Sequence, residues 1–313
     1  MPSSVRVSTN HLSRPVLVFW ALGALGCGYP GLKETPHRSP AELQLLAGDA
    51  AIDRMHWEDA QLHYQRSLAL AQNSGQKWEE ALAQNQLGVL AERLGNLVDA
   101  EHHYLGSRRL QQVHELHGKE LFPAVNLANV CLAQNRHQAA LELAREALGE
   151  IDAAADPDAA ARALRIQGEA EIGIRDFEAA RSSLLHAITL FQRARSPSGE
   201  ASARFVLGQM LLLKGAPKEA IAHLSIARTA FATFKSLESE LRALRALACA
   251  YQMLEQDEMA LGFWERAAER AGELNDRGAR KECLEHGISL LARTGRKEEL
   301  RRWQEALDLL QPP

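Results

Sequence analysis

The sequence predicts an all-α solenoid of about seven antiparallel helix pairs. Three observations lead to this fold class: an alanine recurs every 40 residues, a series of small residues recurs twelve positions before it, and turn residues lie between the two. Self-similarity at a fixed period is the mark of a repeat protein, whose units bury their apolar faces against their neighbours. The composition agrees, because the chain is 46% hydrophobic, only 5% aromatic and poor in strand-forming residues.

The repeat runs through most of the chain without slippage. The recurring alanine is found at Ala60, Ala100, Ala140, Ala180, Ala220 and Ala260. The earlier series of small residues is Gly48, Gly88, Ala128, Gly168, Gly208 and Ala248. Four residues after the alanine a large apolar residue follows at Tyr64, Tyr104, Leu184, Leu224 and Trp264, with Ala144 as the exception. Each unit is therefore expected to form two amphipathic helices whose backbones approach closely at the small residues.

The pattern small-x11-Ala-x3-Tyr-x2-small resembles the tetratricopeptide repeat (TPR). The stretches 199–208 (GEASARFVLG) and 126–130 (NLANV) resemble the longer repeats of a TPR subgroup that includes spindle-orientation adaptors, kinesin light chains and many bacterial regulators. The period is 40 residues, against about 34 in the common TPR, so longer helices and links are expected. The resemblance covers residues 41–313. It implies a right-handed superhelix that binds protein segments, and it names no partner.

The predicted solenoid has two parts. Residues 41–280 are expected to hold six units of 40 residues, and residues 281–313 a seventh, degenerate unit. In the seventh unit Leu300 replaces the alanine and Gln304 the aromatic residue. Its charged surface could be a basic patch. We favour a capping unit with a polar outer face, which solenoids need at their ends, because glutamates alternate with the arginines.

Residues 1–26 do not share the repeat and are interpreted as a signal peptide of the bacterial lipoprotein type. Two arginines and no acid precede the apolar run 16–25, which is too short to span a bilayer. A small residue before Cys27 resembles a lipobox, although Ala24 stands where leucine is usual and Leu25 where a small residue is usual. The resemblance implies that Cys27 carries a lipid. The proline-rich and glycine-containing residues 27–40 then form a flexible tether.

Lipid attachment at Cys27 would place the solenoid on a bacterial membrane, facing the periplasm, with the inner or outer membrane left open. The alternative is a cytosolic TPR regulator in which residues 1–40 are a disordered tail. The net charge of −4 argues against nucleic acid as the main partner.

No motif in the sequence indicates an enzyme or a cofactor. The chain contains no glycine-rich phosphate loop, no HExxH and no GxSxG. The acids Asp49 and Asp53 are four residues apart and could form an acid pair, but a polar helix face is the more common explanation. Cys131, Cys249 and Cys283 lie in three different units without a CxxC pair, so buried free thiols are expected rather than a zinc site or disulfides.

The resemblance to TPR proteins indicates which residues face the concave groove, namely those at fixed positions around the small residue of each first helix. The residues selected as the groove site are Asn85, Phe122, Asn129, Arg162, Arg165, Phe205, Gln209, Arg242 and Arg245. Asn129 matches the asparagine that contacts the ligand in the long-repeat adaptors.

Two pairs of arginines suggest how this groove would bind. Arg162 and Arg165 share one helix face, as do Arg242 and Arg245, and Phe205 lies between the pairs. Because a guanidinium binds a carboxylate through two parallel hydrogen bonds, the hypothesis is a groove for an acidic or C-terminal segment. The alternative, slightly favoured, is that these arginines pair internally with Glu169 or other acids.

The sequence therefore predicts a non-catalytic scaffold or adaptor that holds a protein or peptide segment, as a membrane-anchored lipoprotein in envelope complex assembly. A cytosolic adaptor without an anchor is the first alternative. The second is a binding protein for a small anionic ligand or an envelope glycan, which a deep closed pocket would favour over an open trough.

Overall fold

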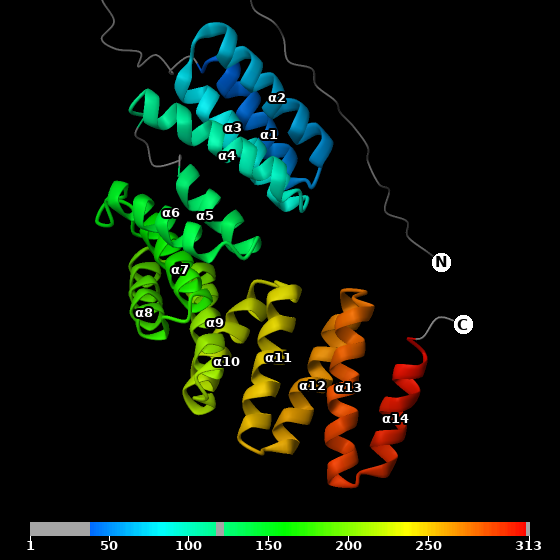
Figure 1. Ribbon diagram of the computed structural model, residues 1–313. Coiled ribbons are helices and arrows are strands. Elements are labelled where there is room, and N and C mark those ends of the chain that lie inside the picture. Colours follow the sequence, from blue (N-terminus) through cyan, green and yellow to red (C-terminus); the bar gives the residue numbers. More distant parts are fainter. Residues whose placement is uncertain (1–37, 117–121, 311–313) are drawn as a thin grey trace, which may run out of the picture. The chain divides into compact units, whose positions relative to one another are not determined.

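A computed structural model describes residues 38–116 and 122–310, and these residues form fourteen helices and no strand (Figure 1). All fourteen belong to one compact unit that begins at Ser39. The predicted signal peptide, Cys27 and most of the tether lie outside the described residues. The helices are α1 (Pro40–Asp53), α2 (Trp57–Ser74), α3 (Lys77–Arg93), α4 (Leu97–Val113), α5 (Pro123–Ala133), α6 (His137–Glu150), α7 (Pro157–Gly173), α8 (Phe177–Arg193), α9 (Pro197–Leu213), α10 (Pro217–Thr233), α11 (Leu237–Met253), α12 (Asp257–Glu273), α13 (Arg277–Thr294) and α14 (Lys297–Asp308).

The helices pack as pairs in chain order, and each pair packs on the next. Each odd-numbered helix contacts the even-numbered helix that follows it, and each even-numbered helix contacts the next odd-numbered one. From α1 to α11, successive odd-numbered helices also contact each other. Successive even-numbered helices of the described residues show no comparable contact. The first helix of each unit therefore lies in the inner layer, where a curved stack of helix pairs has its concave side.

The connections repeat every 20 residues, which is half the sequence period. All described residues with a positive φ lie on this series: Met55, Gly75, Gly95, Glu115, Asn135, Arg175, Arg195, Gly215, Lys235, Glu255, Asn275 and Gly295. A left-handed residue just after a helix lets following N–H groups bond to the last free carbonyls, so it ends the helix. Most helices therefore have 17 residues. The links at 114–122 and 151–156 are longer than the other connections.

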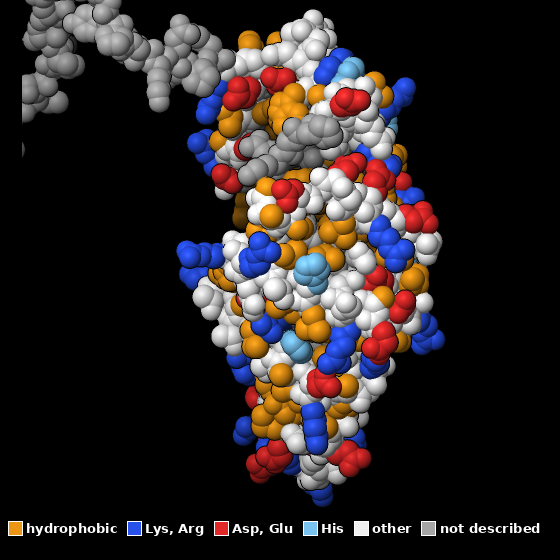
Figure 2. All heavy atoms as spheres, turned by 90° about the vertical axis from the view of Figure 1, so that its left-hand side faces the viewer, with side chains coloured by type: hydrophobic (Ala, Val, Ile, Leu, Met, Phe, Trp, Pro, Cys, Tyr) orange, Lys and Arg blue, Asp and Glu red, His pale blue; other side chains and the backbone are white. Residues whose placement is uncertain are grey.

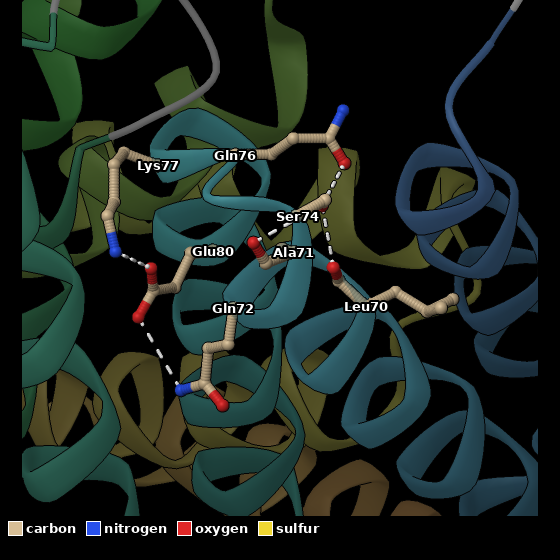
Figure 3. A network of polar contacts seen from close by, with 7 residues as sticks. All are labelled: Leu70, Ala71, Gln72, Ser74, Gln76, Lys77 and Glu80. Atoms are coloured by element: carbon tan, nitrogen blue, oxygen red, sulfur yellow. Dashed lines mark hydrogen bonds and ion pairs between the residues drawn. The ribbon is translucent and has the colours of Figure 1, made fainter.

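The turn between α2 and α3 shows how such a connection is held together (Figure 3). The hydroxyl of Ser74 contacts the carbonyl oxygen of Leu70 at 2.7 Å and Oε1 of Gln76 at 2.9 Å. The nearly buried Glu80 accepts from Lys77 Nζ at 2.8 Å and from Gln72 Nε2 at 3.5 Å, so its carboxylate is not left unpaired.

The two series of small and large residues are direct packing partners. A Cβ atom added to Gly88 would lie 2.6 Å from the ring of Tyr104, and one added to Gly208 would lie 2.6 Å from Leu224 Cγ. The recurring alanines are fully buried, at 0% exposure, where the helices of a unit cross. The series thus exists because a large side chain of the second helix fills the space that the small residue of the first leaves free.

The seventh unit departs less from the pattern than its sequence indicates. A Cβ atom added to Gly287 would lie 1.9 Å from the ring of Trp303, so the pair of small and large residues is present, one position earlier than expected. No residue of α14 is fully buried. Three arginines in or just before α14 pair with acids, namely Arg293 with Asp257 at 3.1 Å, Arg296 with Glu299 at 2.7 Å and Arg301 with Glu305 at 2.9 Å. This mixture of signs favours a polar cap over a basic patch.

The three cysteines among the described residues carry free thiols, as the sequence indicated. Cys131 and Cys283 are buried and Cys249 is half-buried. Burial raises the pKa of all three thiols, that of Cys283 to about 11. Thiols with a raised pKa contain little thiolate and react slowly.

Candidate functional site

A hollow of about 910 Å³ lies along the inner layer of units three to six. Its walls come from the first helices α5, α7, α9 and α11, and from His137, Phe191 and Phe231 of second helices. Several lining residues, among them Arg162, Gln209 and Leu213, are exposed, so the hollow is open to solvent. Six of the nine predicted groove residues line it: Asn129, Arg162, Arg165, Phe205, Gln209 and Arg242.

The floor of this cavity is apolar. Phe205 is 5% exposed, and its ring packs edge-to-face on Phe231 with the ring centroids 6.2 Å apart. Val206 and Met210, one and five residues further along α9, are also buried and complete the floor with Phe191. Val206 and Met210 are four positions apart and therefore lie on one face of α9. An apolar floor with polar rims suits a segment with apolar side chains.

A second cavity of about 420 Å³ adjoins the first and is lined by residues of α9, α11, α12 and α13. Phe205, Gln209, Leu213 and Arg242 belong to both, so we call the two together the trough. In this part Trp264 stacks on His286, with the ring centroids 4.4 Å apart, and donates from Nε1 to Gln252 at 3.1 Å.

Three of the four predicted arginines pair with acids of this chain. Arg162 donates to Asp158 at 2.8 Å, and Arg165 pairs with Glu169, each one helical turn away. Arg245 of α11 pairs with Glu282 of α13, so this pair also joins two units. Internal pairing with acids, the alternative that the sequence also allowed, therefore describes these three arginines. A partner's carboxylate would have to replace one already bound there, which yields little net free energy.

Arg242 differs from the other three arginines. Its side chain is exposed, and within the described residues no carboxylate forms an ion pair with it. Its guanidinium carbon lies 4.9 Å from the centroid of the Phe205 ring. A guanidinium that stacks on a ring keeps its N–H edge available for a bidentate acceptor. Arg242 is thus the one arginine of the trough whose charge no acid of the described chain neutralises.

The two asparagines are bonded within the chain. Asn85 is 5% exposed and accepts from Asn126 Nδ2 at 2.9 Å, and it does not line the trough. Asn129 lines the trough and donates to Glu92, which also accepts from Tyr104 Oη at 2.9 Å. Both amides therefore connect α3 to α5 across neighbouring units. Their role as peptide contacts remains a prediction.

Phe122 directly precedes α5 and does not line the trough. It is half-buried and packs against the apolar cluster that contains Val125 and Ala128. As the residue before Pro123, it ends the long link from α4 and fixes the start of α5. In the structure its contacts are with the core between units three and four.

Asp49 of the suspected acid pair is also held by neighbours. It accepts from Tyr64 Oη at 2.7 Å and from Gln86 Nε2 at 2.8 Å. Burial, together with the bonded carboxylate, raises the pKa of Tyr64, and burial with Glu92 does the same for Tyr104. These groups tie the second helix of a unit to its first, and the first helices of units to each other.

Sequence reasoning named Glu169 as a possible internal partner of the arginines, but it missed Asp158 and Glu282 and the aromatic side chains supplied by second helices. Asp158 and Glu169 each lie four residues from an arginine on the same helix, which is a readable signal for an ion pair. Phe191 and Phe231 offered no such signal, because reaching the trough depends on how the second helices tilt.

Within the described ranges, no three His, Cys, Asp or Glu side chains are grouped in a way that could hold a metal ion. The same residues include no helix that is both long and apolar enough to cross a membrane. The face in Figure 2 shows Lys and Arg interspersed with Asp and Glu rather than gathered by sign.

Comparisons with known proteins agree on the architecture. Residues 79–149 match the family model of the tetratricopeptide repeat, and no curated protein sequence matches the chain. The apo form of RapI has a similar structure, with a TM-score of 0.65 and 10% identity over 87% of this chain and 76% of that one. The predicted all-α solenoid is confirmed, and the predicted tetratricopeptide repeat is confirmed by the family match over residues 79–149.

Two further solved structures share the fold. A Rap protein complexed with competence and sporulation factor has a TM-score of 0.60 and 13% identity, over 86% of this chain and 76% of that one. A signal transduction ATPase with a tetratricopeptide repeat sensor, from Pyrococcus horikoshii, has a TM-score of 0.65 and 15% identity, over 85% of this chain and 40% of that one. At these identities the likeness concerns the fold alone.

Proposed function

We propose that this chain, a tetratricopeptide repeat protein with an α-solenoid fold, is a non-catalytic scaffold that holds a segment of another protein in its trough. The observation that carries the proposal is the open hollow of about 910 Å³ along four successive first helices. An open hollow suits a protein segment, which enters and leaves along its length, better than a small anionic ligand or a glycan, which needs enclosure.

The fold comparisons support a binding role of this kind. One similar structure is a Rap protein complexed with competence and sporulation factor, and another includes a tetratricopeptide repeat described as a sensor. The same architecture therefore occurs in proteins that form complexes. For the present chain the partner has to be inferred from the chemistry of the trough.

The finer proposal is that the segment is acidic or ends in a C-terminal carboxylate. Arg162, Arg165 and Arg245 each have an internal acid, so exchange of carboxylates at these positions contributes little. Substitution of Arg165 and Arg245 by Glu would nevertheless place new negative charge along the trough. We expect the double variant to bind an acidic segment more weakly, and binding equal to wild type would exclude a role for this clamp.

Photo-crosslinking in cells of the source organism tests the scaffold directly. A photoreactive amino acid at Gln209, an exposed residue shared by both cavities, should capture one or a few proteins. The matched control is Gln65, an exposed glutamine of α2 that lines none of the described cavities. Equal capture at both positions, or none at Gln209, would contradict the proposal.

We also propose that a lipid on Cys27 holds the solenoid at a bacterial membrane, facing the periplasm. The support is the sequence pattern alone, namely the apolar run 16–25 followed by a small residue and Cys27. Lipid chains at about 0.8 kcal/mol per buried methylene would anchor the chain stably. The alternative is a cytosolic regulator without an anchor.

Intact mass spectrometry of protein from the native membrane fraction distinguishes the two. A mass of residues 27–313 plus lipid, absent from a Cys27→Ala variant, would support the anchor and make envelope assemblies the place to seek the partner. A full-length unmodified mass in the soluble fraction would rule the anchor out.

A further inference from the structure

The two halves of the trough meet at Arg242. Phe205, Gln209, Leu213 and Arg242 line both cavities, so the trough continues in both directions from this point. On one side lies the floor of Phe205, Met210 and Phe231, and on the other lie Leu212, Ala246 and Trp264. The floors of both cavities are mainly apolar, and the positive charge of Arg242 lies where the two cavities meet.

The charge balance of the trough isolates Arg242. The two cavities contain four arginines and three acids, which leaves one net positive charge if His137 and His286 are neutral. The three acids each pair with one of the other arginines. Because Arg242 stacks on Phe205 and is paired with none of the described carboxylates, its guanidinium is positioned before any ligand arrives. Such preorganisation reduces the entropy lost on binding.

We propose that the trough selects an internal acidic side chain with apolar side chains before and after it in an extended segment of a partner protein. The acid binds Arg242, and the apolar side chains occupy the floors on either side. This proposal rests on the proposed scaffold function and specifies its partner. A C-terminal carboxylate fits less well, because a chain that ended at Arg242 would leave one of the two cavities empty.

The required chemistry follows from the fork of the guanidinium. A carboxylate accepts two parallel N–H donors, whereas a side-chain amide offers one acceptor oxygen and no charge. Replacement of the acid by its amide should therefore weaken binding by about tenfold, equivalent to about 1.4 kcal/mol. The apolar flanks should contribute through burial in proportion to their area.

Fluorescence polarisation with defined peptides tests the proposal on the full chain. The probes are labelled peptides of about ten residues, which span about 33 Å when extended. They carry a central Asp, leucine or phenylalanine at varied positions on both sides, and an amidated C-terminus. Matched probes replace Asp by Asn, or place the acid as a free C-terminal carboxylate after a single apolar flank.

We expect at least one internal Asp probe to bind, its Asn version to bind about tenfold more weakly, and the C-terminal probe to bind more weakly as well. Arg242→Gln should abolish the difference between Asp and Asn probes. The control is Arg266→Gln, because Arg266 also stacks on an aromatic ring, 5.7 Å from the centroid of Phe263, and lines neither cavity. This control should leave the Asp preference unchanged.

Three outcomes would overturn the proposal: equal affinity for Asp and Asn probes, stronger binding of the C-terminal probe, or no binding by any probe. Thermal unfolding of both arginine variants excludes misfolding as the cause. Failure here is distinguishable from failure of the scaffold function, because crosslinking at Gln209 reports a bound protein whatever its sequence preference.

Discussion

In several units a small residue of the first helix is matched to a large side chain that faces it on the second helix. Gly88 and Gly208 lie directly under Tyr104 and Leu224, where a Cβ atom would collide with the partner side chain. Unit three has Ala128 opposite Ala144, so both members are small. The close crossing of two helices therefore needs a small residue on the first helix, while the size of its partner can vary if the local volume remains filled.

Gly88→Ala tests this packing rule. The new methyl group would meet the Tyr104 ring, whose hydroxyl is held by Glu92, so the ring cannot easily move away. We expect overpacking to lower the free energy of unfolding by about 1–3 kcal/mol, measured by urea denaturation. Gly262→Ala is the control, because its Cβ atom would have nothing within 4 Å in the middle of α12. It should stabilise by up to about 1 kcal/mol, and equal effects of the two changes would refute the rule.

Two histidines should make stability depend on pH. Burial, followed by the charge of His102, lowers the pKa of His103, and burial with Arg204 lowers that of His223. Both bind fewer protons in the folded than in the unfolded chain. The free energy of unfolding should therefore fall as the pH drops below the unfolded value of about 6.5, and level off below the folded pKa.

The measurement is urea denaturation at several pH values on both sides of this point. In the double variant His103→Gln and His223→Gln the decrease should be smaller than in wild type. Glutamine at position 103 can still bond to Gln84, the present partner of His103 at 2.7 Å. An unchanged pH dependence in the double variant would show that other groups are responsible.

At the scale of the element, nearly every described connection has one residue with a positive φ, which ends the preceding helix. Glycine and asparagine do this at low cost, yet Met55, Arg195, Lys235 and Glu255 occupy equivalent positions. Non-glycine residues lose about 1–2 kcal/mol in this conformation. The sequence revealed only those turns that contain glycine, asparagine or aspartate, whereas the structure shows the same turn after nearly every helix.

Two substitutions at equivalent turn positions should change the stability of the protein in opposite directions. Lys235→Gly relieves the left-handed conformation after α10 and is expected to stabilise by up to about 1 kcal/mol. Gly215→Ala, at the equivalent turn after α9, is expected to destabilise by a similar amount, although its Cβ atom would meet nothing within 4 Å. Thermal unfolding of both variants provides the check. If Gly215→Ala raised the melting temperature, backbone strain would not be what limits these turns.

The trough also belongs to the scale of the element. The resemblance to tetratricopeptide repeats indicated which face of each first helix points inward, and six of the nine residues chosen in this way line the larger cavity. It did not indicate which of these residues already form ion pairs or hydrogen bonds with other side chains of the protein. Glu282 reaches Arg245 from a helix that begins more than thirty residues later in the chain, and such a contact depends on how units stack.

At the scale of the whole molecule, the apolar core is continuous from α7 to α11 and divided into smaller clusters before α7. In a solenoid each unit depends on its own stability and on the interfaces with its neighbours. The centre of the chain should therefore open less often than the first two units.

Hydrogen exchange should reveal this gradient. We expect amides of α9 to be the most protected and those of α1 and α2 to exchange faster. Leu207→Ala, in the large cluster, should reduce protection throughout α7 to α11. Leu90→Ala, in the cluster of units one and two, should act only on α1 to α4. Uniform protection, or identical effects of the two substitutions, would mean that the solenoid unfolds as a single cooperative body.

The sequence by itself determined the fold class, the period and the crossing points of the helices, and the inward face of each first helix came from the resemblance to tetratricopeptide repeats. These follow from local spacing, because a residue's place on a helix is fixed by its position in the chain. Only the tertiary structure decided which charges remain available. Arg162 and Arg242 occupy the same position in their units, and each has an acid four residues earlier in the chain, Asp158 and Glu238. Arg162 nevertheless pairs with Asp158, whereas Arg242 stacks on Phe205. The local spacing of arginine and acid is the same in both units, and the ring of Phe205, which packing of α9 on α11 brings under Arg242, is what distinguishes them.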